Sequence, residues 1–164
     1  MGRSPRLIRR IALPILLVVL AAGLLYSIEP VRVHADSMQP TLRSGDEVLV
    51  DRLSLVLRAP HRGEIVVANA PDIGLVVKRV AAVGGDTVGI EDGVLVVNGH
   101  AEKEGYVDYA SIDGSYFGPV RVAPGAVFLL GDNRGNSEDS RDFGAVPEDD
   151  VVGRVLVRVW PVKR

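Results

Sequence analysis

The chain has 164 residues, which favours one folded domain with an appended segment over two full domains. It contains no cysteine, so disulfide bonds and thiolate metal sites are excluded. The formal net charge is −2, but the first ten residues hold four arginines and no acid, which leaves 15 basic against 21 acidic residues in the remainder. Such an acidic body argues against nucleic-acid binding.

The first predicted element is an apolar helix over residues 11–28, in which Ser27 is the only clearly polar side chain. At 1.5 Å per residue this helix would span about 27 Å, close to the roughly 30 Å of a bilayer core. Because arginines precede it and Glu29 follows it, the positive-inside rule predicts a cytoplasmic N-terminus. The alternative is a cleavable secretory signal, since residues 21–23 are small, but cleavage there would leave an odd apolar N-terminus. We therefore predict a basic tip and one uncleaved transmembrane anchor over residues 1–30, followed by an extracytoplasmic domain over residues 31–164.

A serine, Ser37, follows at the junction of an extended apolar segment and a Pro-Thr turn. Even a fully extended link from Ile28 keeps this serine within roughly 30 Å of the membrane edge. A serine hydroxyl is a poor nucleophile until a base takes its proton. Asp36 is adjacent, but neighbouring strand residues point to opposite faces, and the three histidines lie in no recognisable triad context.

Past this turn, short runs rich in valine alternate with turn signals. The runs cover residues 47–52, 64–68, 75–83, 93–99, 126–130 and 151–159. Their spacing of about 8 to 15 residues predicts a mainly β domain of packed antiparallel sheets. The polar residues 102–119 are predicted to form a long loop or hairpin insertion, and the only helical turn expected after residue 30 lies near residues 53–58.

The best candidate for the base is Lys78. Strand alternation puts Lys78 on the same face as Val76 and Val80, so its amine would project among valines. Burial disfavours the charged form of lysine and lowers its pKa, which suits it to act as a base near neutral pH. Serine–lysine pairs are a known variant of the catalytic triad. The alternative is an edge-strand lysine that reaches solvent.

A third block, residues 131–144, is rich in Asp, Asn, Ser and Arg. Asp139 and Arg141 are spaced to form an ion pair that stiffens a loop, and Ser137 has the hydrogen-bonding capacity to orient an amine. The alternative interpretation of this block is a solvated acidic loop.

With these three blocks together, the sequence resembles the type I signal peptidases, the membrane-bound serine proteases that remove signal peptides. The similarity runs in the family's order through residues 37–42, 45–50, 63–67, 78–86, 131–144 and 152–155. It implies an antiparallel β-sheet catalytic domain of the signal-peptidase type behind one N-terminal transmembrane helix. A short insertion at about residues 102–119 would replace the large second domain of some relatives. No metal or cofactor is implied, and no metal-ligand spacing is visible in the sequence.

Carried over residue by residue, the resemblance makes Ser37 the nucleophile and Lys78 the general base. Ser137 would orient the Lys78 amine, while Asp139 and Arg141 would support the loop. The backbone N–H of Ser37 would donate to the oxyanion.

The resemblance also implies a substrate pocket for small side chains, lined by Val33 and Met38 with Val76 and Val77 opposite. Ala35 stands where some members of the family have a serine or threonine as a second oxyanion donor. A side-chain donor of this kind is worth on the order of 10²–10³ in rate, so a backbone group or water must compensate.

The implied partners are preprotein signal peptides with small residues at the first and third positions before the cut, the lipid bilayer, and the nearby protein-export translocon. We expect a single-pass protein of the bacterial plasma membrane, because no transit peptide precedes the anchor. A thylakoid-type membrane stays open. Two other functions also stay open: a serine–lysine protease with a dedicated substrate, such as a pilin or conjugation protein, and an inactive membrane-anchored β module that binds proteins.

Overall fold

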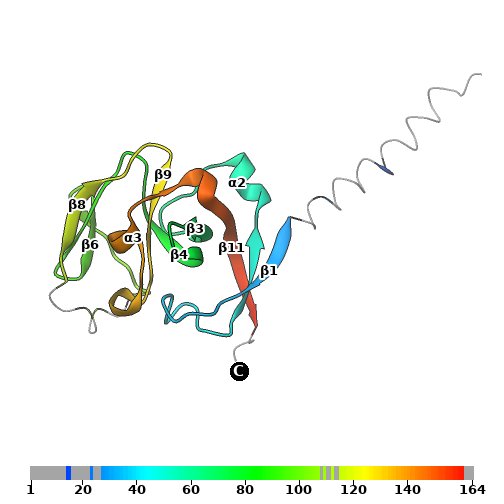
Figure 1. The fold of residues 1–164 in the computed structure, drawn as a ribbon, viewed down its shortest axis with the longest axis horizontal. Coiled ribbons are helices and arrows are strands. Elements are labelled where there is room, and N and C mark those ends of the chain that lie inside the picture. Colours follow the sequence, from blue (N-terminus) through cyan, green and yellow to red (C-terminus); the bar gives the residue numbers. More distant parts are fainter. Residues whose placement is uncertain are drawn as a thin grey trace, which may run out of the picture.

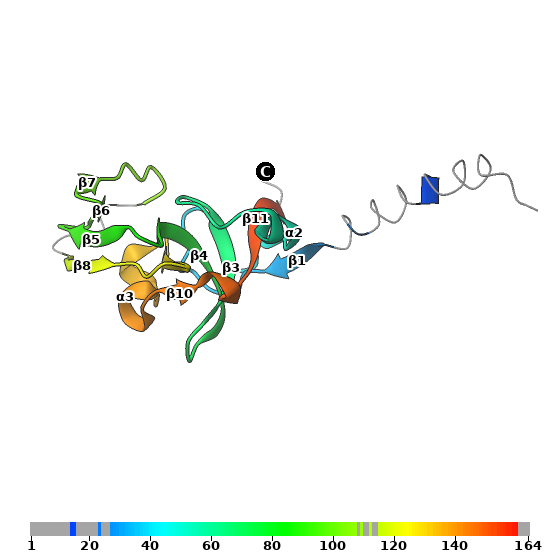
Figure 2. The ribbon, with the colours of Figure 1, turned by 90° about the horizontal axis from the view of Figure 1, so that it is seen from above.

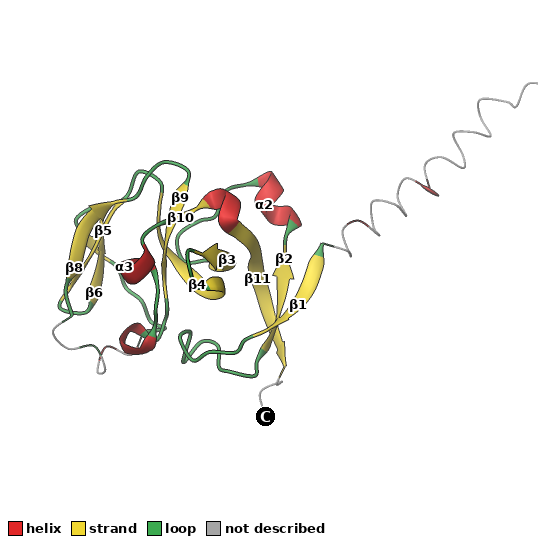
Figure 3. Ribbon diagram, viewed as in Figure 1, coloured by secondary structure: helices red, strands yellow, loops and turns green. Residues whose placement is uncertain are grey.

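The computed structural model describes residues 14, 15, 23, 27–107, 109, 112 and 115–160. Within these residues the chain forms two antiparallel sheets with short helices between the strands, so the prediction of a mainly β domain is confirmed (Figures 1 and 3). The seven-stranded sheet has the order β1-β2-β11-β3-β4-β9-β10, and the four-stranded sheet has the order β7-β6-β5-β8.

The strands of the larger sheet are β1 (Ile28–Arg32), β2 (Glu47–Asp51), β3 (Ile65–Ala70), β4 (Gly74–Val83), β9 (Ala126–Leu130), β10 (Val146–Pro147) and β11 (Val151–Trp160). Those of the smaller sheet are β5 (Thr87–Glu91), β6 (Val94–Val97), β7 (His100–Ala101) and β8 (Phe117–Arg121). The helical elements are α2 (Leu53–Leu57), η2 (Arg134–Asn136), α3 (Ser140–Phe143) and η3 (Glu148–Asp150). The helical turn predicted near residues 53–58 is therefore present as α2.

The longest hairpin of the larger sheet, β3–β4, projects from the body of the domain (Figure 2). Its strand β4 pairs with β3 from Gly74 onward, but pairing with β9 begins only at Arg79. The first half of β4 thus keeps one edge free of strand pairing among the described residues, and Lys78 is the last residue of this half. Because every pairing in the sheet is antiparallel, alternate strands run parallel, so β1 and β4 point in the same direction.

Among the described residues, the buried apolar side chains of the strands gather in three cores. One core lies between the sheets, where Phe117 and Phe128 meet at a ring-centroid distance of 5.5 Å. A second core on the larger sheet gathers Val33, Met38 and Leu42 against Val48 and other valines. This second core anchors the chain on both sides of Ser37, because Met38 directly after it and Val33 four residues before it are both buried.

The described residues of the predicted insertion at residues 102–119 contain no strand before Phe117, where β8 begins. The predicted anchor, residues 1–30, lies mostly outside the described residues. Among the residues that are described, no helix has the length and apolar character needed to cross a membrane.

Candidate active site

An open groove of about 550 Å³ lies between the extended segment that follows β1 and the first half of β4, which has one unpaired edge. Ser37 and Lys78 both line this groove. So do the four residues that were expected to form the substrate pocket, which are Val33, Met38, Val76 and Val77. The segment after β1 and the strand β4, which are far apart in the sequence, therefore meet around one cleft that has both apolar and polar lining residues.

Ser37 lies in a tight turn that follows β1. The Gln39 N–H donates to the Asp36 carbonyl at 3.1 Å, and the Leu42 N–H donates to the Met38 carbonyl at 2.9 Å. Met38 and Leu42 hold the turn in place because their side chains are buried in the core, while Ser37 itself stays partly exposed to the groove.

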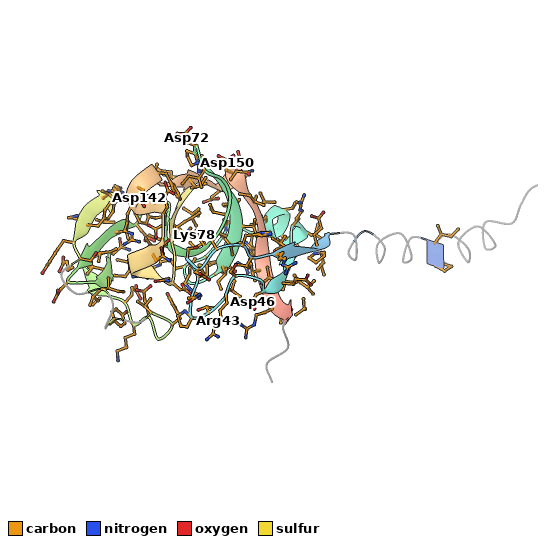
Figure 4. The ribbon with its side chains drawn as sticks, turned by 60° about the horizontal axis from the view of Figure 1, so that its bottom comes forward. Arg43, Asp46, Asp72, Lys78, Asp142 and Asp150 are labelled. Carbon is orange, nitrogen blue, oxygen red and sulfur yellow. The ribbon has the colours of Figure 1, made fainter. Side chains whose placement is uncertain are left out.

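Lys78 lies in the interior of the domain, whereas Asp72 at the tip of the β3–β4 hairpin lies at its edge (Figure 4). The Lys78 side chain is buried, with 4% of the residue exposed, so the prediction that strand alternation buries this amine is confirmed. Burial lowers the pKa of Lys78, and the positive charge of Arg141 adds to this, while the Asp139 carboxylate opposes it. Desolvation is the largest of these influences, so the neutral amine is favoured relative to a free lysine.

A chain of hydrogen bonds runs behind this amine. Lys78 Nζ donates to Ser137 Oγ at 2.9 Å, and Ser137 Oγ donates to Asp139 Oδ2 at 2.8 Å. The Asp139 carboxylate is fully buried and also accepts from Arg141 Nε at 2.8 Å and from the Gly131 N–H at 3.0 Å. The predicted ion pair between Asp139 and Arg141 is therefore present, and Asp139 also caps the N-terminus of α3.

The direction of these bonds has a chemical consequence. A hydroxyl has one hydrogen to donate, and Ser137 donates it to Asp139, so Ser137 acts as the acceptor toward Lys78. A neutral amine has two N–H groups and one lone pair. With an N–H committed to Ser137, the lone pair of Lys78 remains available to accept a proton from another group in the groove.

The signal peptidase family model, peptidase S26, matches residues 6–160. The chain belongs to the signal peptidase family. As a member of peptidase S26 it is a hydrolase of the signal peptidase I type. The similarity identified from the sequence blocks is thereby confirmed.

Individual relatives of this signal peptidase agree with the family match. The probable signal peptidase I-2 of Synechocystis is 38% identical over 155 residues, covering 90% of this chain and 70% of the relative. Signal peptidase I of Bacillus caldolyticus is 38% identical over 144 residues, covering 80% of this chain and 79% of the relative. The crystal structure of a signal peptidase I from Enterococcus faecalis aligns with a TM-score of 0.52 at 34% identity, over 61% of this chain and 98% of that one.

The site of this signal peptidase includes three residues to which the sequence analysis gave no role. The Asn133 N–H donates to the Ser37 carbonyl at 2.9 Å, and Asn133 Nδ2 donates to the Asp36 carbonyl at 3.1 Å. Next to it, the Asp132 carboxylate accepts from the Thr41 hydroxyl at 2.5 Å and from Arg79 at 2.8 and 2.7 Å. The loop that carries Ser137 therefore also holds the turn that carries Ser37.

Gly131 is the third residue of this kind. A Cβ at Gly131 would lie 2.2 Å from Ser137 Oγ and 2.5 Å from the Ser37 carbonyl oxygen, so these groups would have to move to accommodate any side chain there. The available sequence signal was a Gly-Asp-Asn run directly after the apolar residues 126–130. Within the described part of the chain, no three His, Asp or Glu side chains converge into a metal site.

Proposed function

We propose that this signal peptidase removes N-terminal signal peptides from exported preproteins, with Ser37 as the nucleophile and Lys78 as the general base. The observation that carries the proposal is the buried Lys78 amine, which is held by Ser137 in the groove that Ser37 also lines. A base near neutral pH must lose its charge, and burial in a valine-rich strand favours that loss.

In the proposed mechanism, Ser37 Oγ attacks the scissile carbonyl while the lone pair of Lys78 takes the hydroxyl proton. The negative charge that develops on the carbonyl oxygen is received by the Ser37 backbone N–H. The Lys78 ammonium then returns the proton to the leaving amine as the C–N bond breaks, which leaves an acyl-enzyme ester on Ser37. Lys78 next takes a proton from a water molecule that attacks this ester, and the proton passes to Ser37 Oγ as the ester bond breaks.

The substrate would lie extended beside residues 31–36, or between them and residues 75–78 of β4, pairing backbone to backbone. The free edge in the first half of β4 supports this arrangement, because its backbone groups have no second strand partner among the described residues. Val33, Met38, Val76 and Val77 would accept the small side chains that precede the cut.

The anchor over residues 1–30 belongs to the proposal as well. The apolar run of residues 11–28, with arginines before it, supports a single-pass bacterial plasma-membrane protein with a cytoplasmic N-terminus and an extracytoplasmic domain over residues 31–164. Ser37 would then act close to the outer membrane surface, near the translocon from which preproteins emerge.

The test is incubation of the full, detergent-solubilised chain with a preprotein whose signal ends in Ala-x-Ala, beside the Ser37→Ala and Lys78→Ala variants. Cleavage after the second alanine by the parent alone supports the proposal and excludes a passive binding module. If the parent does not cleave, or if either variant cleaves as fast as the parent, the proposal is wrong. A panel of unrelated preproteins separates a general signal peptidase from a protease with one dedicated substrate.

A further inference from the structure

The peptide unit between Asp36 and Ser37 is held by hydrogen bonds on its carbonyl side. Its carbonyl oxygen accepts two hydrogen bonds, from the Gln39 N–H at 3.1 Å and from Asn133 Nδ2 at 3.1 Å. The next carbonyl, that of Ser37, accepts from the Asn133 N–H at 2.9 Å. One asparagine from a distant loop therefore holds two consecutive carbonyl groups of the serine turn.

The geometry of the peptide unit carries this restraint to the other side. The Asp36–Ser37 bond is trans, and in a trans peptide the C=O and the N–H lie in one plane and point in opposite directions. Fixing the direction of the Asp36 carbonyl therefore fixes the direction of the Ser37 N–H. Among the described residues, the Ser37 N–H donates to no backbone or side-chain acceptor, so this donor is left free for a ligand.

We propose that Asn133 is a positioning residue that aims the Ser37 N–H at the oxyanion of the substrate. The inference rests on the proposed function, in which this N–H stabilises the tetrahedral intermediate. Ala35 has no hydroxyl to serve as a second donor, so the orientation of the backbone donor matters more in this chain. Preorganised donors stabilise a transition state because no reorganisation is needed when the charge develops.

Asn133 and Ser137 lie in the same loop, but each holds a different reacting residue. Ser137 hydrogen-bonds to Lys78, whereas among the described residues the Asn133 side chain hydrogen-bonds only to the Ser37 turn, at the Asp36 carbonyl. Loss of the Asn133 side chain should therefore weaken oxyanion binding without changing the ionisation of Lys78. A general loosening of the site would instead alter both.

The decisive variant is Asn133→Ala, which removes Nδ2 but keeps the backbone bond to Ser37. Two probes separate its effects: a peptide aldehyde ending in Ala-x-alaninal, and the same peptide ending in a carboxamide. Ser37 Oγ adds to the aldehyde carbon as the C=O π bond breaks and the hydroxyl proton passes to Lys78, and the resulting hemiacetal oxygen occupies the oxyanion position. The carboxamide binds without reaction.

For Asn133→Ala we expect kcat/KM for the preprotein to fall about 10-fold or more, mainly in kcat, because full removal of an oxyanion donor costs about 10²–10³-fold. Affinity for the aldehyde should fall by a similar factor, while affinity for the carboxamide changes less than about 2-fold and the pH midpoint of kcat/KM stays in place. Asn69→Ala, at an exposed asparagine of β3 outside the groove, is the matched control and should behave like the parent.

Full activity of Asn133→Ala would overturn the inference, and so would equal losses of aldehyde and carboxamide affinity. If Asn133→Ala does not fold, Asn133→Asp keeps the side-chain shape but cannot donate, and the ratio of the two affinities decides in the same way. A parent chain that fails to cleave any preprotein refutes the proposed function itself, whereas an active parent with an unaffected Asn133→Ala refutes only this inference.

Discussion

Ser137 accepts a hydrogen bond from Lys78 at 2.9 Å while giving its own hydrogen to Asp139 at 2.8 Å. The buried carboxylate thus determines which way the serine hydroxyl points, and the hydroxyl in turn determines the direction of the amine. The proposed base is therefore oriented by a neutral hydroxyl, and the Asp139 carboxylate is one hydrogen bond further along the chain of contacts. A carboxylate in direct contact would stabilise the charged amine and raise its pKa.

Replacement of this hydroxyl is the first test of the arrangement. Ser137→Ala removes the acceptor of the Lys78 N–H, so the amine is no longer held toward the groove, and we expect kcat to fall about 10- to 100-fold with little change in KM. Ser137→Thr keeps a hydroxyl and should retain more activity than Ser137→Ala. Steady-state kinetics on a signal-peptide substrate measures both, and a loss confined to KM would contradict the positioning role.

Lys78 is predicted to lower the free energy of unfolding although activity depends on it. Because burial lowers its pKa, the folded chain binds this proton less readily than the unfolded chain, so the lysine destabilises the fold increasingly as pH falls below 10.5, the pKa of free lysine. Lys78→Met, of similar length and without charge, should raise Tm at neutral pH and lower cleavage by about 10⁴-fold or more. A lower Tm together with lost activity would mean that the lysine is part of the packing instead.

Close approach of the two loops makes Gly131 the most sensitive glycine of the site. Gly131→Ala would place a methyl group within 2.2 Å of Ser137 Oγ, so the serine turn and the 131–137 loop must move apart. We expect an activity loss of about 10²-fold, since displacements of about 1 Å at a catalytic site have costs of this size. Gly105→Ala is the matched control, because a Cβ there meets nothing within 4 Å, and activity equal to the parent in both variants would rule out the close packing.

The Asp139–Arg141 pair is expected to support the fold as well as the site. Asp139→Asn leaves Arg141 without its carboxylate partner in a largely buried position, and breaking such a pair costs about 3 kcal/mol of unfolding free energy. Urea denaturation of the parent and the variant measures this difference. Asp150→Asn, at an exposed aspartate of η3, should change stability by less than about 0.5 kcal/mol (Figure 4). Equal effects of the two substitutions would show that the buried ion pair contributes no more to the unfolding free energy than an exposed aspartate does.

Local patterns were sufficient to predict much of this site. Alternation along residues 74–80 predicted the burial of Lys78, and the spacing of Asp139 and Arg141 predicted their ion pair. Both features depend on residues close together in the sequence. They follow from strand geometry and side-chain reach alone.

The contacts between distant segments could not be predicted in this way. Asn133 Nδ2 reaches the Asp36 carbonyl across 97 residues of sequence, and such a contact depends on how the whole sheet folds. The insertion predicted at residues 102–119 contains a second contact of this kind, because Glu104 is buried and forms an ion pair with Arg134, 30 residues further along the chain. Spacing within one segment carries no information about pairs of this kind.

The central claim is that Lys78 is uncharged when it takes the proton of Ser37. Its most direct test is an NMR titration of the Lys78 side chain in the full, detergent-solubilised chain, compared with the pH dependence of kcat/KM, which reports ionisations of the free enzyme. We predict that both give the same midpoint, clearly below 10.5, with cleavage lost as acid protonates the amine. A Lys78 midpoint at the value of free lysine, or a rate that stays level while Lys78 titrates, would contradict the account.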